Sequence, residues 1–201
     1  MSIQRHGSVK YEIYEKIKGA YRIDMGFERL EKNLIDIIKE EQAKLGYRKE
    51  SIRLYYPLGS LKHLLKADAD IEKMREVLDD FCDEVKEFFG QIEVTNNGER
   101  FCFKVPDAGV EYVHENMAEN EFICGLVKLV SGHGCTIEKI REYFLSYNND
   151  IHYEKTKNGE FDYLLYFNNG IPDKYYYCFT VEECHVIYHR FLKHDYEDFE
   201  F

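Results

Sequence analysis

The sequence predicts an α+β protein that is mainly helical and carries two small antiparallel β-hairpins or sheets. A near-repeat is the first observation behind this prediction: Ile-Glu-Lys-Met-Arg-Glu at 71–76 returns as Ile-Glu-Lys-Ile-Arg-Glu at 137–142. The second observation is the setting of each copy. Each copy follows a residue suited to a helix N-cap, Asp70 or Thr136, and precedes strand-like runs around Asn-Gly-Glu. The repeated order of helix and hairpin predicts two units of similar shape, but it identifies no chemistry.

The boundary between the two units is expected near residue 118. We predict an N-terminal arm at 1–24, a first helix and hairpin unit at 25–118, and a second at 119–201. A chain of 201 residues can bury a core as one domain or as two small ones, so the two units can also pack as one domain.

Apolar spacing predicts the helices of the first unit. Residues 27–45 carry apolar side chains on one helical face, and Gly46 is suited to end that helix. The clearest helix covers 71–88, with an apolar stripe at Ile71, Met74, Leu78, Phe81, Val85 and Phe88. A short helix is expected at 9–21, although the alternation around Tyr11–Tyr14 fits a strand equally well. The other expected elements are a strand at 51–56, a helix opened by Pro57, strands at 91–95 and 100–105, and a helix at 106–117.

The second unit is expected to follow the same plan with an extension. Helices are predicted at 121–130 and 136–147, followed by a hairpin at 151–156 and 161–167 and an extra strand at 175–179. Thr180-Val181-Glu182-Glu183 matches a capping box, which predicts a final helix from there.

Charge and composition limit the classes of partner. The chain has a net charge of −11, with 44% hydrophobic and 32% charged residues. Residues 1–50 hold 11 Lys and Arg against 9 Asp and Glu, so the acidic excess lies in the remainder. Such a surface repels phosphate backbones and anionic membranes unless a local basic patch is present. No apolar run approaches the roughly 18 residues that span a bilayer. Six cysteines without a CxxC pair and the absence of an apolar leader favour free thiols in the cytoplasm.

Helices 121–130 and 136–147, followed by the Asn158-Gly159 turn, resemble a winged-helix domain. The resemblance implies either protein binding or nucleic-acid binding. The helix at 136–147 has only Lys139 and Arg141 as cations, against two glutamates, which is weak for a helix that enters the major groove. The cations that would form a nucleic-acid patch are Arg48, Lys49, Arg53, Lys155 and Lys157.

Histidines near the C-terminus suggest a metal site as a further alternative. On the predicted final helix, His185 and His189 would share one face, and Glu182 would be a third ligand. His133 and Cys135 lie in a predicted loop and could complete the site. The sequence lacks an H-E-x-x-H motif, paired cysteines, a P-loop and a GxGxxG motif, so no cofactor is predicted.

Three stretches, Leu30–Asp36, Gly46–Glu50 and Ile52–Leu58, resemble the opening of an uncharacterised family from Gram-positive anaerobic bacteria. The resemblance covers most of the chain from Met25 onward. It implies a bacterial cytoplasmic protein, and it transfers no catalytic or binding residue.

These observations favour a non-enzymatic interaction or regulatory module whose partner is a protein with a basic surface. The expected contact residues are aromatic: Tyr55, Tyr56, Tyr175, Tyr176 and Tyr177. The alternatives are a winged-helix-like nucleic-acid binder and a metal-dependent enzyme that uses the last helix. Self-association through the helix at 71–88 is compatible with each of the three functions.

Overall fold

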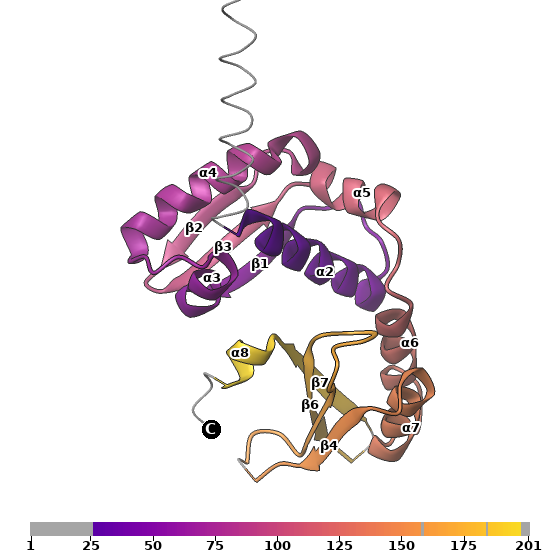
Figure 1. Ribbon diagram of the computed structural model, residues 1–201. Coiled ribbons are helices and arrows are strands. Elements are labelled where there is room, and N and C mark those ends of the chain that lie inside the picture. The colour runs from indigo at the N-terminus through magenta and orange to yellow at the C-terminus, as the bar shows by residue number, and fades with distance from the viewer. Residues whose placement is uncertain (1–25, 158, 184, 198–201) are drawn as a thin grey trace, which may run out of the picture. The chain divides into compact units, whose positions relative to one another are not determined.

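A computed structural model describes residues 26–157, 159–183 and 185–197 (Figure 1). The expected arm at 1–24 and the helix at 9–21 lie outside these residues. The described elements are, in order, α2 (Phe27–Leu45), β1 (Ile52–Pro57), α3 (Leu58–Leu65), α4 (Ile71–Phe89), β2 (Glu93–Asn97), β3 (Arg100–Val105), α5 (Asp107–Asn116), α6 (Glu121–Val130), α7 (Ile137–Tyr147), β4 (Ile151–Lys155), β5 (Tyr163–Phe167), β6 (Tyr176–Val181), β7 (Val186–Phe191) and α8 (Lys193–Glu197). The predicted α+β class, with two small antiparallel sheets, is confirmed.

The chain forms two compact units. The first contains the described residues through Ile38 together with Lys49–Met117, and the second contains Lys39–Arg48 and the chain from Ala118 onward. The sequence places all of 25–118 in the first unit, whereas the end of α2 belongs to the second. Helix α2 therefore contributes residues to both units.

The sheet of the first unit has three antiparallel strands in the order β1-β3-β2. Side chains alternate between its two faces, as the strand geometry requires. One face is apolar and buried, with Leu54 and Tyr56 on β1 and Phe101, Phe103 and Val105 on β3. Helices α2 and α4 run beside this sheet in Figure 1. The rings of their residues Phe27 and Phe81 meet edge to face at 5.6 Å.

The predicted stripe of α4 forms the centre of this core. Met74, Leu78, Phe81 and Val85 are almost completely buried. At the end of the helix the sequence prediction is wrong by one residue, because Phe89 is buried and Phe88 is 41% exposed. Because this stripe is buried inside the first unit, its apolar side chains are not exposed for self-association through α4.

The first hairpin forms where the Asn-Gly-Glu turn predicts it. Asn97 pairs with Arg100 across the turn. Gly98 has a φ of 58°, a left-handed conformation that glycine adopts without steric cost.

The second unit has a four-stranded antiparallel sheet in sequence order, β4-β5-β6-β7. Helices α6 and α7 lie beside this sheet in Figure 1. Aromatic rings of both helices pack on one of its faces. Phe144 of α7 stacks on Phe167 of β5 at 5.0 Å and meets Tyr177 of β6 edge to face at 5.3 Å. Phe122 of α6 joins the same cluster, 5.1 Å from Phe144.

The predicted final helix is wrong. Thr180 and Val181 belong to β6 and pair with Ile187 and Val186 of β7, and the helix that follows in the described residues is the short α8. The capping box is local, whereas Val186–Phe191 is rich in β-branched and aromatic residues that fit a pleated strand. Pairing with β6 decides the conformation. The sheet of the second unit is therefore a four-stranded meander. The winged-helix resemblance remains a hypothesis.

Candidate functional site

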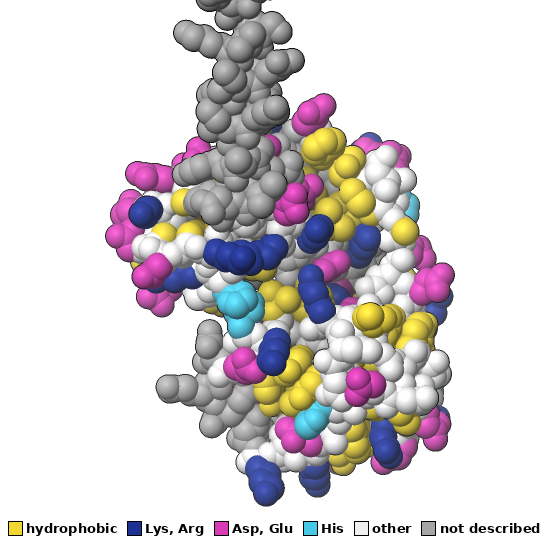
Figure 2. Space-filling view, in the orientation of Figure 1, with side chains coloured by type: hydrophobic (Ala, Val, Ile, Leu, Met, Phe, Trp, Pro, Cys, Tyr) yellow, Lys and Arg dark blue, Asp and Glu magenta, His cyan; other side chains and the backbone are white. Residues whose placement is uncertain are grey.

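The charges do not single out a site at first sight. In the view of Figure 2, acidic and basic side chains are interspersed over the surface, with apolar side chains between them. Neither sign forms a continuous field on that face.

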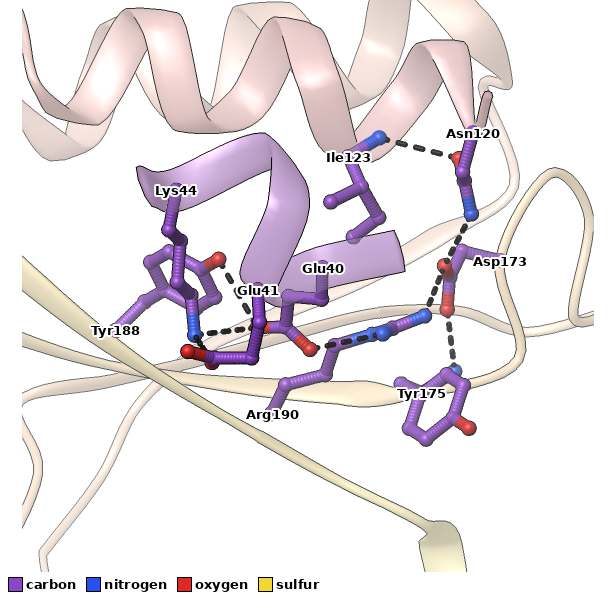
Figure 3. Close-up of polar contacts among 9 residues, drawn as sticks. All are labelled: Glu40, Glu41, Lys44, Asn120, Ile123, Asp173, Tyr175, Tyr188 and Arg190. Atoms are coloured by element: carbon purple, nitrogen blue, oxygen red, sulfur yellow. Dashed lines mark hydrogen bonds and ion pairs between the residues drawn. The ribbon is translucent and has the colours of Figure 1, made fainter. Parts of the chain in front are cut away.

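A buried polar cluster of the second unit surrounds Arg190 of β7 (Figure 3). Its guanidinium lies 2.9 Å from a carboxylate oxygen of Glu40 and 2.8 Å from one of Asp173. It also lies 3.7 Å from the centre of the Tyr175 ring, a cation–π contact. Asp173 accepts further hydrogen bonds from the backbone N–H of Tyr175 at 2.9 Å and from Asn120 at 3.5 Å.

Glu40, on the part of α2 that belongs to the second unit, completes this cluster. It forms an ion pair with Lys44 at 2.9 Å and accepts a hydrogen bond from the Tyr188 hydroxyl at 3.0 Å. Burial raises the pKa of Glu40, but Arg190 and Lys44 together outweigh burial, so the pKa lies below its ordinary value. Burial and the Glu40 carboxylate both raise the pKa of Tyr188, which keeps its hydroxyl a neutral donor.

This cluster is buried inside the second unit and offers no access to a ligand. The side chains of Arg190, Asp173 and Glu40 are 4%, 2% and 8% exposed. Two carboxylates and two cations neutralise one another inside it. A function must therefore use another part of the surface.

Four of the cysteines in the described part of the chain are not activated as nucleophiles. Burial raises the pKa of Cys82 and of Cys178 to about 12. It also raises the pKa values of Cys124 and Cys135. Because the thiolate is the reactive form, these four thiols remain protonated and unreactive near neutral pH.

The proposed metal ligands do not share one face of a helix. His189 lies on strand β7 and His185 just before it, so four residues separate their Cα atoms by about 13 Å instead of one helical turn. His185 lies 2.7 Å from Glu182, and both line an open hollow together with His133 and Cys135. Among the described residues, no group of three or more His, Cys, Asp or Glu side chains is placed to hold a metal ion.

Strand alternation divides the five candidate contact tyrosines. Tyr56, Tyr175 and Tyr177 are at most 4% exposed and belong to the cores, so their expected role in partner contact is wrong. Tyr55 is 52% exposed, and Tyr176 is partly exposed. Since successive strand residues point to opposite faces, a run of three tyrosines cannot lie on one surface.

The candidate nucleic-acid cations are divided between the two units. Arg53 and Lys49 belong to the first unit, and Lys49 is paired with Glu111 at 2.8 Å. Arg48, Lys155 and Lys157 belong to the second unit.

A row of rings crosses the other face of the second sheet, and sequence reasoning missed most of it. His152 of β4 stacks on Tyr166 of β5 with ring centres 4.6 Å apart. Tyr166 stacks on Tyr176 of β6 at 3.9 Å, and Tyr196 of α8 lies 5.5 Å from Tyr176. All four side chains are partly exposed. We name His152, Tyr166, Tyr176 and Tyr196 the tyrosine row; finding it requires the register of three strands.

Two carboxylates flank the tyrosine row. Glu154 lies 3.2 Å from the His152 imidazole. The pKa of Tyr166 is raised mainly by burial, with Glu154 adding to the effect. Burial also raises the pKa of Tyr176, and Glu197 adds to that shift. The row therefore presents neutral phenols beside negative charge, which suits cationic groups.

Comparison with known proteins identifies a family without an assigned activity. No helix among the described residues is long and apolar enough to cross a membrane. No curated protein and no solved structure matches the chain. A family model described from an E. rectale gene as a domain of unknown function matches residues 27–200, which confirms the resemblance inferred from the opening of the chain. The chain belongs to this family of domains of unknown function, DUF3877.

Proposed function

We propose that this protein is a non-enzymatic interaction module that binds a Lys- or Arg-rich segment of a partner protein at the tyrosine row. The stack of His152, Tyr166 and Tyr176 across three strands, flanked by carboxylates, is the observation that carries the proposal. Stacked rings fix their own orientation, so little conformational freedom is lost when a partner binds.

Charge favours a cationic partner over an anionic one. The side chains of Glu154 and Glu197 are 51% and 58% exposed, so they remain available to a guanidinium or ammonium group. Lys193 lies 3.7 Å from Glu197 and neutralises part of this charge. The net charge of −11 would also speed the approach of a basic partner.

Titration of the full-length protein by two-dimensional NMR tests the proposal. The probe is a decapeptide of alternating Arg and Gly, and the same peptide with Glu in place of Arg is the comparison. We expect the Arg peptide to shift backbone resonances of β4, β5 and β6, and the Glu peptide to shift none. The double substitution Glu154→Gln and Glu197→Gln should weaken binding about fivefold, the scale of two exposed ion pairs of about 0.5 kcal/mol each.

Glu72→Gln with Glu76→Gln is the matched control, because both side chains are exposed on α4 in the first unit. It makes the same change in net charge and should leave binding unchanged. If the control variant weakens binding equally, the effect is general electrostatics and the tyrosine row is not the site. If the Arg peptide shifts no resonance of the second sheet, the proposal fails.

The cytoplasm remains our proposed location for this activity. Five cysteines in the described part of the chain are free thiols, which suits a reducing compartment. Fractionation of cells that express the full-length protein, with immunoblotting of each fraction, tests this location.

A further inference from the structure

The outer face of the first sheet is chemically unlike the tyrosine row. Arg53 and Tyr55 alternate outward on β1, and Tyr55 is 52% exposed. Across the sheet, Arg53 pairs in register with Lys104 and Pro57 with Arg100. The exposed tyrosine therefore lies among three cations from two adjacent strands. We name Arg53, Tyr55, Arg100 and Lys104 the cationic face.

The contacts within this face leave positive charge available. The Arg100 guanidinium lies over the Tyr55 ring at 4.6 Å, which orders both groups. Lys104 forms an ion pair with Glu93 of β2 at 3.0 Å, with both side chains largely exposed. Arg53 forms no ion pair within the described part of the chain. Three cations against one carboxylate give this face a local excess of positive charge, although the protein carries −11.

The composition of the face favours a nucleic acid over a protein segment. An acidic protein partner usually also buries apolar side chains at the centre of its contact. Besides Tyr55 and Pro57, the outward positions of the three strands are polar or small: Glu93, Thr95, Asn97 and Cys102 accompany the three cations. One exposed ring beside cations is instead the combination that stacks an unpaired base and neutralises its phosphates. The major groove admits a helix or a two-stranded ribbon, so the face of a three-stranded sheet is a poor fit for paired DNA.

We infer that the cationic face binds single-stranded nucleic acid, with a base stacked on Tyr55 and phosphates held by Arg53, Arg100 and Lys104. This site is independent of the tyrosine row and lies in the other unit. The face is three strands wide, with strands about 4.8 Å apart, and about four residues long, with about 3.3 Å per residue. This area accommodates a short stretch of two or three nucleotides. Binding through about three phosphates predicts a slope near −2 when log affinity is plotted against log salt concentration.

Fluorescence anisotropy of the full-length protein with labelled octathymidine and octauridine tests this inference. Salt starts near 20 mM, because phosphate contacts with cations are strongest at low salt, and is then raised to obtain the slope. We expect Tyr55→Ala to weaken binding about tenfold or more, since base stacking on an aromatic ring has that scale. Arg53→Ala should reduce the size of the salt slope by about 0.7, the effect of one lost phosphate contact. Binding of either oligonucleotide supports the site.

Lys73→Ala is the matched control, because Lys73 is an exposed cation on α4 in the same unit. It changes the net charge as Arg53→Ala does, and we expect affinity and salt slope to stay as in the wild type. The inference is overturned if neither oligonucleotide binds, if Tyr55→Ala binds as tightly as the wild type, or if Lys73→Ala is as weak as Arg53→Ala. It is also overturned if octaglutamate displaces the oligonucleotides and depends equally on Tyr55, because the face would then be a site for acidic protein segments.

Discussion

The interiors of the two units are built on different principles. Around the first sheet the buried side chains are almost all apolar, and Asn33 and Ser60 are its buried polar residues in the described range. In the second unit, Glu40, Asp173 and Arg190 are buried together as an ion-pair cluster. Apolar packing tolerates pH and salt, whereas a buried ion pair depends on every partner being present and charged. The difference predicts that the two units respond differently to the same kind of perturbation.

The outer faces of the sheets differ as well. The first exposes cations around one tyrosine, and the second exposes a row of rings flanked by carboxylates. A net charge of −11 describes neither surface. Local charge on a sheet face, and not the total charge, should decide which ligand each unit binds.

Arg190→Met should produce the largest effect on the comparison. It would leave the carboxylates of Glu40 and Asp173 buried without their shared cation, which should lower the free energy of unfolding by about 3–5 kcal/mol. Urea unfolding followed by circular dichroism measures the change. Replacing Glu40, Asp173 and Arg190 together by Leu, Leu and Met should recover much of it, because no uncompensated charge then remains.

Lys104→Met is the control for Arg190→Met, since it removes the exposed ion pair with Glu93 in the first unit. It should change stability by less than about 1 kcal/mol. If Arg190→Met is as mild as this control, the buried cluster is not what distinguishes the second unit.

Packing in the first unit is tested by Gly109→Ala on α5. A Cβ atom there would lie 2.6 Å from the Phe89 carbonyl oxygen and 2.8 Å from Cγ1 of Val105. Backbone would have to move, so we expect a loss of about 1–3 kcal/mol measured by thermal unfolding. Gly125→Ala on α6 is the counterpart in the second unit, where the new Cβ meets the Tyr143 hydroxyl. That side chain can turn away, so Gly125→Ala should be the milder change; the opposite order would contradict this account.

The two helix caps give a smaller and closely matched test. The Asp70 carboxylate accepts a hydrogen bond from the N–H of Lys73 at 2.9 Å, and the Thr136 hydroxyl accepts one from Lys139 at 3.4 Å. Replacing either cap by Ala should cost about 1 kcal/mol, as judged by urea midpoints. Asp70→Ala should cost more, because its bond is shorter and its charge also favours the helix N-terminus. Equal or reversed losses would show that the caps do not follow these contacts.

Acid stability is the most subtle expected difference. Because Arg190 and Lys44 hold the pKa of Glu40 below its ordinary value of 4.5, this carboxylate stabilises the fold above that pH. The contribution should be lost as pH falls below 4.5 through the lowered pKa. Unfolding midpoints from pH 3 to 7 measure the loss, and Glu40→Gln should flatten that dependence. An unchanged acid limb in this variant would assign it to other carboxylates.

Sequence patterns predicted most helices and strands, but not the strand pairing and side-chain contacts that form the tyrosine row. The stripe of α4 and the first hairpin follow from local periodicity and turn chemistry, so they were predictable. The final helix was not, because the Thr180–Glu183 capping box competes with a strand whose pairing depends on the rest of the sheet. The tyrosine row unites residues from three strands and α8, and no local pattern reveals such a register. Alternation alone, however, could have separated Tyr176 from its buried neighbours.

The shared helix α2 has a consequence for how the protein is made. Glu40 and Arg190 are 150 residues apart in the sequence, and the second unit needs both. During synthesis the first unit can form its core once residue 117 has left the ribosome. Glu40, however, has no Arg190 to pair with until β7 has been made. The end of α2 therefore exposes to water, until translation is almost complete, side chains that are buried in the folded second unit. A fragment that starts at residue 118 would lack Glu40 altogether, and adding a peptide of α2 in trans is the natural way to restore it.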